Sequence, residues 1–136
     1  MKTATTAETV MDFKVYYADT DAYGVVWHGT YLRWFEAART EFLCQYGISI
    51  EDIQSKDKVV MPVIEINVQY KASVKTGEKV KVFTSIEELK QHYVVFRQIV
   101  KGGDKIYTTA TVKCVGVDEN GRLIRNMDVF LRDCSV

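Results

Sequence analysis

The segment from residue 29 to residue 47 limits the fold more than any other part of the chain. Its large apolar residues recur at steps of three and four, which is the spacing of one face of an α-helix. Gly47 is a natural stop at the carboxyl end of such a helix. Further apolar residues widen this face, so we expect a helix from Gly29 or Thr30 that is buried on most of its circumference. The first set is Tyr31, Trp34, Phe35, Ala38, Phe42 and Tyr46, and the second is Leu32, Ala37 and Leu43.

The segments on either side of this helix alternate apolar and polar residues, which predicts β-strands. One strand precedes the helix, between Val10 and Tyr17, and about four strands follow a polar connector at residues 54–59. A hairpin signal, KGGD, joins the last two long strands. DVFLRD near the end predicts a short final strand or a frayed end. The long strands after the connector read VIEINVQY, KVKVFTSIEEL, HYVVFRQIV and KIYTTATVKCVGV.

These elements predict an α+β fold with a single sheet and a single long helix. Consecutive strands joined by short turns pair antiparallel, and a sheet with one apolar helix to cover has to curl around that helix. We therefore expect an antiparallel sheet of about five strands wrapped around a central helix. The length of 136 residues is enough for one domain with a real core. We assign residues 1–136 to this domain and expect residues 1–8 to form a flexible tail.

Composition excludes several classes of protein. The formal net charge is zero, which argues against a nucleic-acid or membrane-surface protein. No apolar run approaches the ~18 residues of a membrane span, and the first ten residues lack the apolar region of a secretory signal. Cys44, Cys114 and Cys134 are odd in number and lack metal-ligand spacing. We expect reduced thiols, no metal site and a cytoplasmic location.

The stretch YYADTDAYGVVWHGTYLRWFEAART, residues 16–40, places carboxylates and a histidine at the mouth of the apolar helix. Asp21 lies in the turn before the helix, and His28 lies one or two residues before its first turn. The first N–H groups of a helix lack intrahelical partners, and the helix dipole makes that end partly positive. A carbonyl oxygen placed there would be polarised, and a nearby carboxylate could attack the carbonyl or activate a water. These groups suit acyl transfer or hydrolysis.

An ordinary structural interpretation fits the same residues. Aspartate is common in turns before helices because it caps free N–H groups, which explains at least one of Asp19 and Asp21. A lone histidine near a helix start is more often a polar loop residue than a catalyst. Spacing alone leaves both interpretations open.

Residues 16–40 resemble the acyl-CoA thioesterases of the 4-hydroxybenzoyl-CoA thioesterase family, which have the hotdog fold. They are most similar to the branch that includes the Tol-Pal-associated thioesterases. The segment MPVIEINVQYKASVKTGEKV is similar to the second strand of the family and its following turn, although Ser73 and Glu78 stand where the family often has Pro and Asp. The matching positions are Tyr17, Asp19, Thr20, Asp21, Gly24, Val25, Val26, His28, Tyr31, Phe35, Glu36, Ala38 and Arg39.

The resemblance implies roles for particular residues. Asp21 matches the catalytic aspartate, as nucleophile or general base, and His28 matches the position that polarises the thioester carbonyl. Val60 and Met61 match positions that line the acyl pocket, although ordinary core packing explains them equally well. Glu36 is a reserve catalytic candidate because a different hotdog branch uses a carboxylate on this helix; it could also form an ion pair with Arg39. Asp19 is expected to shape the turn by hydrogen bonding.

The resemblance also implies a function. We expect a hotdog acyl-CoA thioesterase that converts an acyl-CoA and water to a carboxylic acid and free CoA, with no metal or redox cofactor. In the family the active site lies between two protomers, so we expect a homodimer, and dimers often pair into tetramers. Two alternatives remain: a hotdog enoyl-CoA hydratase or dehydratase, and a protein that senses acyl-CoA without turnover. CoA phosphates need positive partners, and the available cations are Lys71, Lys75, Arg97, Lys101 and Lys105.

Overall fold

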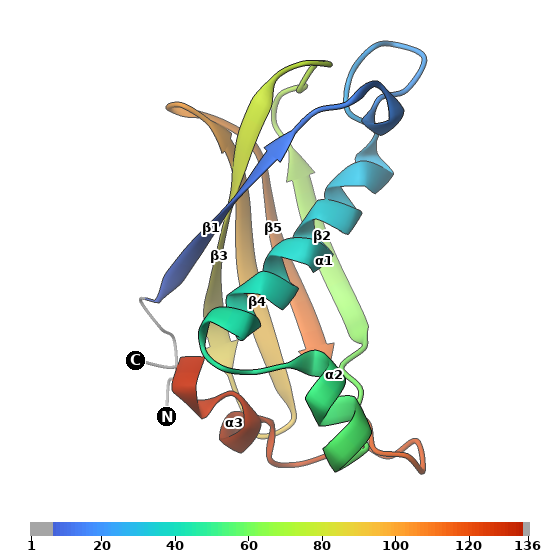
Figure 1. Ribbon diagram of the computed structural model, residues 1–136, viewed down its shortest axis with the longest axis vertical. Helices are drawn as coiled ribbons and strands as arrows, with labels where there is room; N and C mark the ends of the chain where they lie inside the picture. Colours follow the sequence, from blue (N-terminus) through green and yellow to red (C-terminus); the bar gives the residue numbers. More distant parts are fainter. Residues whose placement is uncertain (1–6, 135–136) are drawn as a thin grey trace.

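The computed structural model describes residues 7–134, in which five strands form one antiparallel sheet beside a long helix (Figure 1). Helix α1 (His28–Gln45) lies across one face of the sheet. The α+β architecture predicted from the sequence is confirmed. The strand order across the sheet is β1-β3-β4-β5-β2. The strands are β1 (Glu8–Lys14), β2 (Val63–Tyr70), β3 (Lys79–Leu89), β4 (Tyr93–Gly102) and β5 (Lys105–Val115).

The sheet is built from two hairpins and two added edge strands. Strands β3, β4 and β5 follow one another in chain order, and Gly103 in the β4–β5 turn has the positive φ of 61° that the KGGD signal predicts. Strand β2 pairs with β5 rather than with β3, its successor in the chain, so the expected pairing of consecutive strands is wrong there. The connection at residues 71–78 instead passes the amino end of α1, where Val26 N–H donates to the Val74 carbonyl at 2.7 Å. This bond joins the connection to the segment that holds the candidate catalytic residues.

The core lies between α1 and the sheet, and α1 faces it with one side only. Six apolar helix residues are buried there, but Leu32 remains 42% exposed and Glu36 is also exposed. The expectation of a helix buried on most of its circumference is therefore wrong for a single chain, because the sheet covers one side and no described element covers the other. The buried residues are Tyr31, Trp34, Phe35, Ala38, Phe42 and Leu43.

Two segments are helical where the sequence did not predict a helix. The connector around residues 54–59 forms α2 (Ile50–Asp52) and a π-helical turn, η2 (Ile53–Asp57). The segment DVFLRD forms α3 (Met127–Phe130) and a 3₁₀ turn, η3 (Arg132–Cys134), so the predicted final strand is wrong. The physical reason is a helical spacing of apolar residues: Met127, Leu131 and Cys134 are all buried in the core cluster that contains Phe42 and Phe96.

The chain ends and the helix start also differ from expectation. Glu8 and Thr9 pair with Ser85 and Thr84 in the sheet, so β1 begins inside the predicted tail, while residues 1–6 lie outside the described residues. The first strand ends at Lys14 rather than Tyr17, and a 3₁₀ turn, η1 (Tyr17–Asp19), follows it. Helix α1 begins at His28, one residue before the predicted start.

Candidate active site

A tight hairpin at residues 20–26 holds Asp21 in front of α1. Thr20 and Val26 form an isolated β-bridge, and the Asp21 N–H donates to the Val25 carbonyl at 2.9 Å. The Gly24 N–H donates a hydrogen bond to the Asp21 carbonyl at 3.0 Å. Gly24 has a φ of 77°, a conformation that favours glycine. The backbone of Asp21 is therefore fixed by short-range hydrogen bonds.

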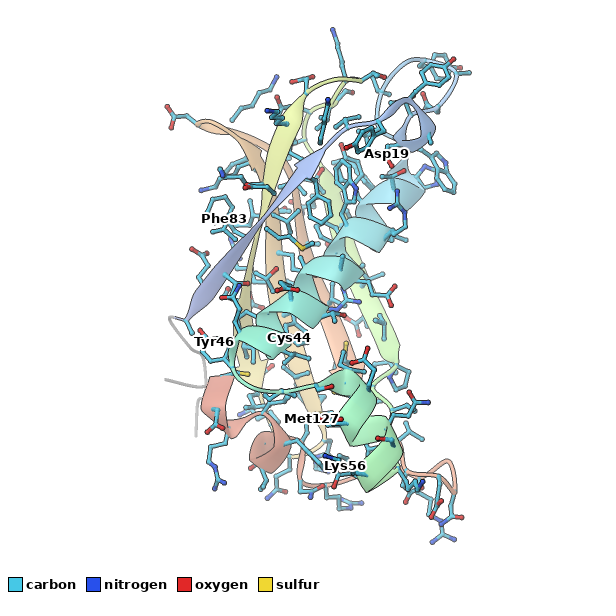
Figure 2. All side chains as sticks on the ribbon, viewed as in Figure 1. Asp19, Cys44, Tyr46, Lys56, Phe83 and Met127 are labelled. Carbon is cyan, nitrogen blue, oxygen red and sulfur yellow. The ribbon has the colours of Figure 1, made fainter. Side chains whose placement is uncertain are left out.

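Asp19 anchors this hairpin to the helix. Its carboxylate accepts the Tyr16 N–H at 2.9 Å and the Arg33 guanidinium at 2.6 Å. Its carbonyl accepts the Trp27 N–H and the Thr30 hydroxyl, both at 3.0 Å. Figure 2 shows Asp19 at the amino end of α1. The prediction that Asp19 shapes the turn is confirmed, whereas the part of Arg33 was missed because no local spacing links a loop carboxylate to the second turn of a helix.

The Asp21 carboxylate is half-buried and only partly engaged. Its Oδ1 accepts the Tyr23 N–H at 2.8 Å, which is the local hydrogen bond expected of aspartate in a turn. Its Oδ2 has no partner among residues 7–134. One oxygen therefore holds the turn, and the other remains available to a ligand or a water.

The amino end of α1 has open hydrogen-bond donors. The N-cap residue is Trp27, whose side chain cannot accept a hydrogen bond from the helix backbone. The Thr30 N–H donates to the Trp27 carbonyl at 2.8 Å, but the His28 and Gly29 N–H groups have no acceptor within the described chain. Helices usually satisfy such donors with a Ser, Thr, Asp or Asn cap. This end of α1 therefore presents two adjacent N–H groups to an incoming oxygen.

The side chains of His28 and Trp27 lie at the rim of this position. His28 is exposed, and its ring centroid lies 5.1 Å from that of Trp27. No hydrogen bond joins the His28 and Asp21 side chains, as far as the described residues show. A Cβ added to Gly29 would come within 2.3 Å of the Trp27 ring, so the indole lies directly against the first turn of α1.

The two predicted acyl-pocket residues have different surroundings. Met61 lines a cavity of about 350 Å³ between α1 and the sheet, together with Glu36, Arg39, Val63, Phe96 and Cys114 among others. Val60 does not line it; it is 42% exposed and forms an isolated bridge with Val117. Two further cavities, of about 500 and 280 Å³, lie elsewhere. Neither Asp21 nor His28 lines any of these three cavities.

Arg39 binds the sheet rather than Glu36. Its guanidinium donates to Gln98 Oε1 at 3.1 Å, and no carboxylate of the described chain lies within 4.0 Å of it. The Glu36–Arg39 ion pair that their spacing allows is therefore absent from residues 7–134. Burial lowers the pKa of the Arg39 guanidinium and raises the pKa of the neighbouring Cys114 thiol.

The described residues contain neither a metal-binding cluster nor a membrane-spanning helix. Within residues 7–134 no group of three His, Cys, Asp or Glu side chains is placed to hold a metal ion. None of the helices in that range is long and apolar enough to cross a membrane.

Comparison with known proteins decides the family. The model of the Thioesterase-like superfamily matches residues 15–133. The chain belongs to this superfamily. The acyl-CoA thioesterase YbgC of Haemophilus influenzae is 33% identical over 105 residues, covering 77% of each chain. The acyl-CoA thioester hydrolase YbgC of Escherichia coli O6:H1 is 34% identical over 106 residues, covering 77% of this chain and 78% of that one.

Solved thioesterase structures share the fold. The DHNA-CoA thioesterase of Staphylococcus aureus has a TM-score of 0.84 at 30% identity and covers 93% of this chain and 85% of that one. The 4-hydroxybenzoyl-CoA thioesterase of Pseudomonas sp. strain CBS-3 has a TM-score of 0.85 over 93% of this chain and 99% of that one. At 20% identity the second likeness concerns the fold alone. The predicted membership of the thioesterase family and the hotdog fold are confirmed.

Proposed function

We propose that this protein is an acyl-CoA thioesterase in which Asp21 and the amino end of α1 act on the thioester carbonyl. The observation that carries the proposal is the pair of open N–H groups at His28 and Gly29, beside the hairpin that holds Asp21. The superfamily membership and the relatives named as acyl-CoA thioesterases support the choice of substrate.

The helix end supplies electrostatic stabilisation. The thioester oxygen would accept hydrogen bonds from the His28 and Gly29 N–H groups, at the partly positive end of an 18-residue helix. As the carbonyl carbon becomes tetrahedral, its oxygen gains negative charge, and these donors stabilise that charge. One such donor commonly contributes a factor of about 10²–10³ in rate.

Asp21 supplies the attacking group or activates it. With Oδ1 engaged by the Tyr23 N–H, Oδ2 can attack the carbonyl and form an anhydride that water then cleaves. Alternatively, Oδ2 takes a proton from a water that attacks directly. In both routes the C–S bond breaks, water supplies the oxygen of the new acid, and the CoA sulfur leaves as a thiol. The exposed His28 ring is placed at the rim, where it can assist proton transfer to the sulfur.

A homodimer would complete the site. Strand β2 ends the sheet, and it is exposed or half-exposed along its whole length, including the apolar residues Val63, Ile64, Ile66 and Tyr70. The outer side of α1, with Leu32, is likewise uncovered. An exposed apolar edge strand is an aggregation hazard unless another chain covers it. Pairing of two protomers along β2 and α1 would cover both surfaces and enclose the open position in front of α1. Light scattering after size-exclusion chromatography would give a mass of two chains, or of four if dimers pair.

The proposal includes a cytoplasmic location and no cofactor. All three cysteines are free thiols, which supports a reducing compartment. Hydrolysis by a carboxylate and backbone donors needs neither a metal nor a redox group.

The test is release of free CoA thiol from a panel of short, long and aromatic acyl-CoAs. An acyl-CoA thioesterase releases thiol from at least one of them. If binding is measurable but no thiol appears, the protein is an acyl-CoA sensor. Hydration of an enoyl-CoA without release of thiol would identify a hydratase instead.

A further inference from the structure

The strongest unexplained feature of the molecule is the Arg39 guanidinium at the wall of the 350 Å³ cavity. It is half-buried, and its one hydrogen bond goes to the amide oxygen of Gln98. A guanidinium carries five N–H donors. The described chain thus leaves most of them without acceptors and provides no carboxylate within ion-pairing distance.

The position of this cation is fixed by a buried network. Gln98 is fully buried, and its Nε2 donates to the Phe35 carbonyl at 2.9 Å and to Thr84 Oγ1 at 3.0 Å. Both bonds use the amide N–H groups of Gln98, so its oxygen has to face Arg39. The guanidinium is therefore held by α1 and β4 together rather than by solvent alone.

The cavity gives this cation no ion pair among the described residues. Most of the walls near Arg39 are apolar, including Leu43, Met61 and Phe96. Cys114 stays a neutral thiol because burial raises its pKa. Glu36 lines the same cavity and its charge favours the charged form of Arg39, but it is exposed and makes no ion pair with the guanidinium. Charges that leave water are normally paired, so an acceptor from outside the chain is the missing partner.

Arg39 in the cavity wall also lies within reach of an acyl chain whose thioester is bound at His28. Helix α1 rises about 1.5 Å per residue, which puts Arg39 about 16 Å along the axis from His28. Long helix side chains lean toward the amino end, which shortens this span. On β2, Ile66 and Val68 stand opposite the buried Val112 and Ala110 and so present an apolar surface on the helix side of the sheet.

From these relationships we infer that the cavity binds the far end of a medium-length acyl group that carries a terminal carboxylate, with Arg39 as its partner. The inference rests on the proposed thioesterase function, because the chain length follows from a thioester at His28. Arg39 then determines specificity at a distance from the bond that breaks. A guanidinium binds a carboxylate through two parallel hydrogen bonds, which an uncharged methyl end cannot make.

Binding of two free acids tests the inference without turnover. Decanoate and decanedioate have the same chain length, and only decanedioate has a second carboxylate. Isothermal titration of the parent protein should give about tenfold tighter binding of decanedioate. Arg39→Met should remove this preference, and Arg39→Lys should keep part of it. Arg122→Met is the control: it removes an exposed arginine outside this cavity, and the preference should remain.

Turnover separates the two proposals. The corresponding decanoyl-CoA and decanedioyl-CoA should differ in kcat/KM by a similar factor in the parent and not in Arg39→Met. Equal binding of both acids by the parent would overturn the inference, even if both thioesters are hydrolysed. Binding preference without hydrolysis of any acyl-CoA would overturn the proposed function and leave the carboxylate site standing. If Arg39→Met does not fold, the preference of the parent protein for decanedioate over decanoate still tests the inference.

Discussion

The Arg33 guanidinium donates a 2.6 Å hydrogen bond to the Asp19 carboxylate, and so joins the second turn of α1 to the loop that precedes it. Asp19 is buried, whereas 65% of the Arg33 side chain is exposed. Asp19 and Arg33 therefore contribute unequally to the stability of the fold. Asp19 also accepts the Tyr16 N–H and holds the backbone in front of the helix, while Arg33 supplies one solvent-screened charge.

We expect Asp19→Ala to lower the free energy of unfolding by about 2 kcal/mol, because it removes charge-assisted hydrogen bonds and leaves the Tyr16 N–H without its acceptor. Arg33→Met should cost less than about 1 kcal/mol, since the Arg33 side chain is mostly exposed and its charge is screened by solvent. Urea unfolding would measure both. Lys81→Met, which breaks the exposed Lys81–Asp12 pair, serves as the control. Equal losses for Asp19→Ala and Arg33→Met would contradict this ranking.

Asp21→Asn should lower kcat for a hydrolysed acyl-CoA by a factor of about 10²–10⁴, because the amide can neither attack nor take a proton. The amide oxygen can still accept the Tyr23 N–H, so the melting temperature should not change. Steady-state thiol release and thermal unfolding of the same preparation check both statements. Asp12→Asn, an exposed aspartate in β1, is the matched control. A variant that hydrolyses as fast as the parent would remove Asp21 from the mechanism.

Gly29→Ala should impair catalysis through Trp27. The new Cβ would lie 2.3 Å from the indole, so the ring has to leave its position against the first turn. Alanine itself favours the helix by roughly 0.5–1 kcal/mol, and hence stability should hold. The double variant Gly29→Ala with Trp27→Ala separates the causes. If the collision is responsible, Gly29→Ala has an effect on kcat/KM in the parent but none in the Trp27→Ala background.

Gln98→Leu should destabilise the fold by about 2 kcal/mol, because it removes the hydrogen bond to the Thr84 hydroxyl in the core and the bond that holds the Arg39 guanidinium. The Phe35 carbonyl loses only its second donor, since it still accepts a backbone N–H within α1. Thr84→Val removes one acceptor and should cost less. Chemical denaturation of the two variants beside the parent gives the comparison. A stability of Gln98→Leu equal to that of the parent would mean that the network is not needed for folding.

The buried Cys134 thiol should make the folded protein less stable at alkaline pH. Burial raises the pKa of its thiol from 9.0 to about 12, so the folded chain holds this proton more tightly than the unfolded chain does. The contribution of this thiol to the free energy of unfolding is therefore complete below pH 9 and is lost as the pH rises toward 12. Between pH 8 and pH 10 the parent should lose about 1 kcal/mol more than Cys134→Ala. Parallel urea titrations at the two pH values test this, and equal losses would show that the thiol does not contribute.

Local patterns in the sequence determined most of the secondary structure and the candidate residues. The three-and-four spacing of α1, the alternation of β2 to β5 and the glycines of the turns act between neighbours in the chain, and the strand VIEINVQY matches β2 from end to end. The segment DVFLRD was predicted as a strand or a frayed end, but Met127 and Leu131, four residues apart, are both buried in a shared core, and the segment is helical.

Only the tertiary structure decided how the site is built, because its key contacts join residues far apart in the chain. Gln98 already interrupts the apolar phase of β4 in the sequence, yet its partner Arg39 lies on another element. The pairing of β2 with β5 and the one-sided cover of α1 likewise depend on the path of the whole chain. The spacing of residues in a sequence indicates which face of a helix or strand each one occupies. The residues that contact that face are determined by how the helices and strands pack together.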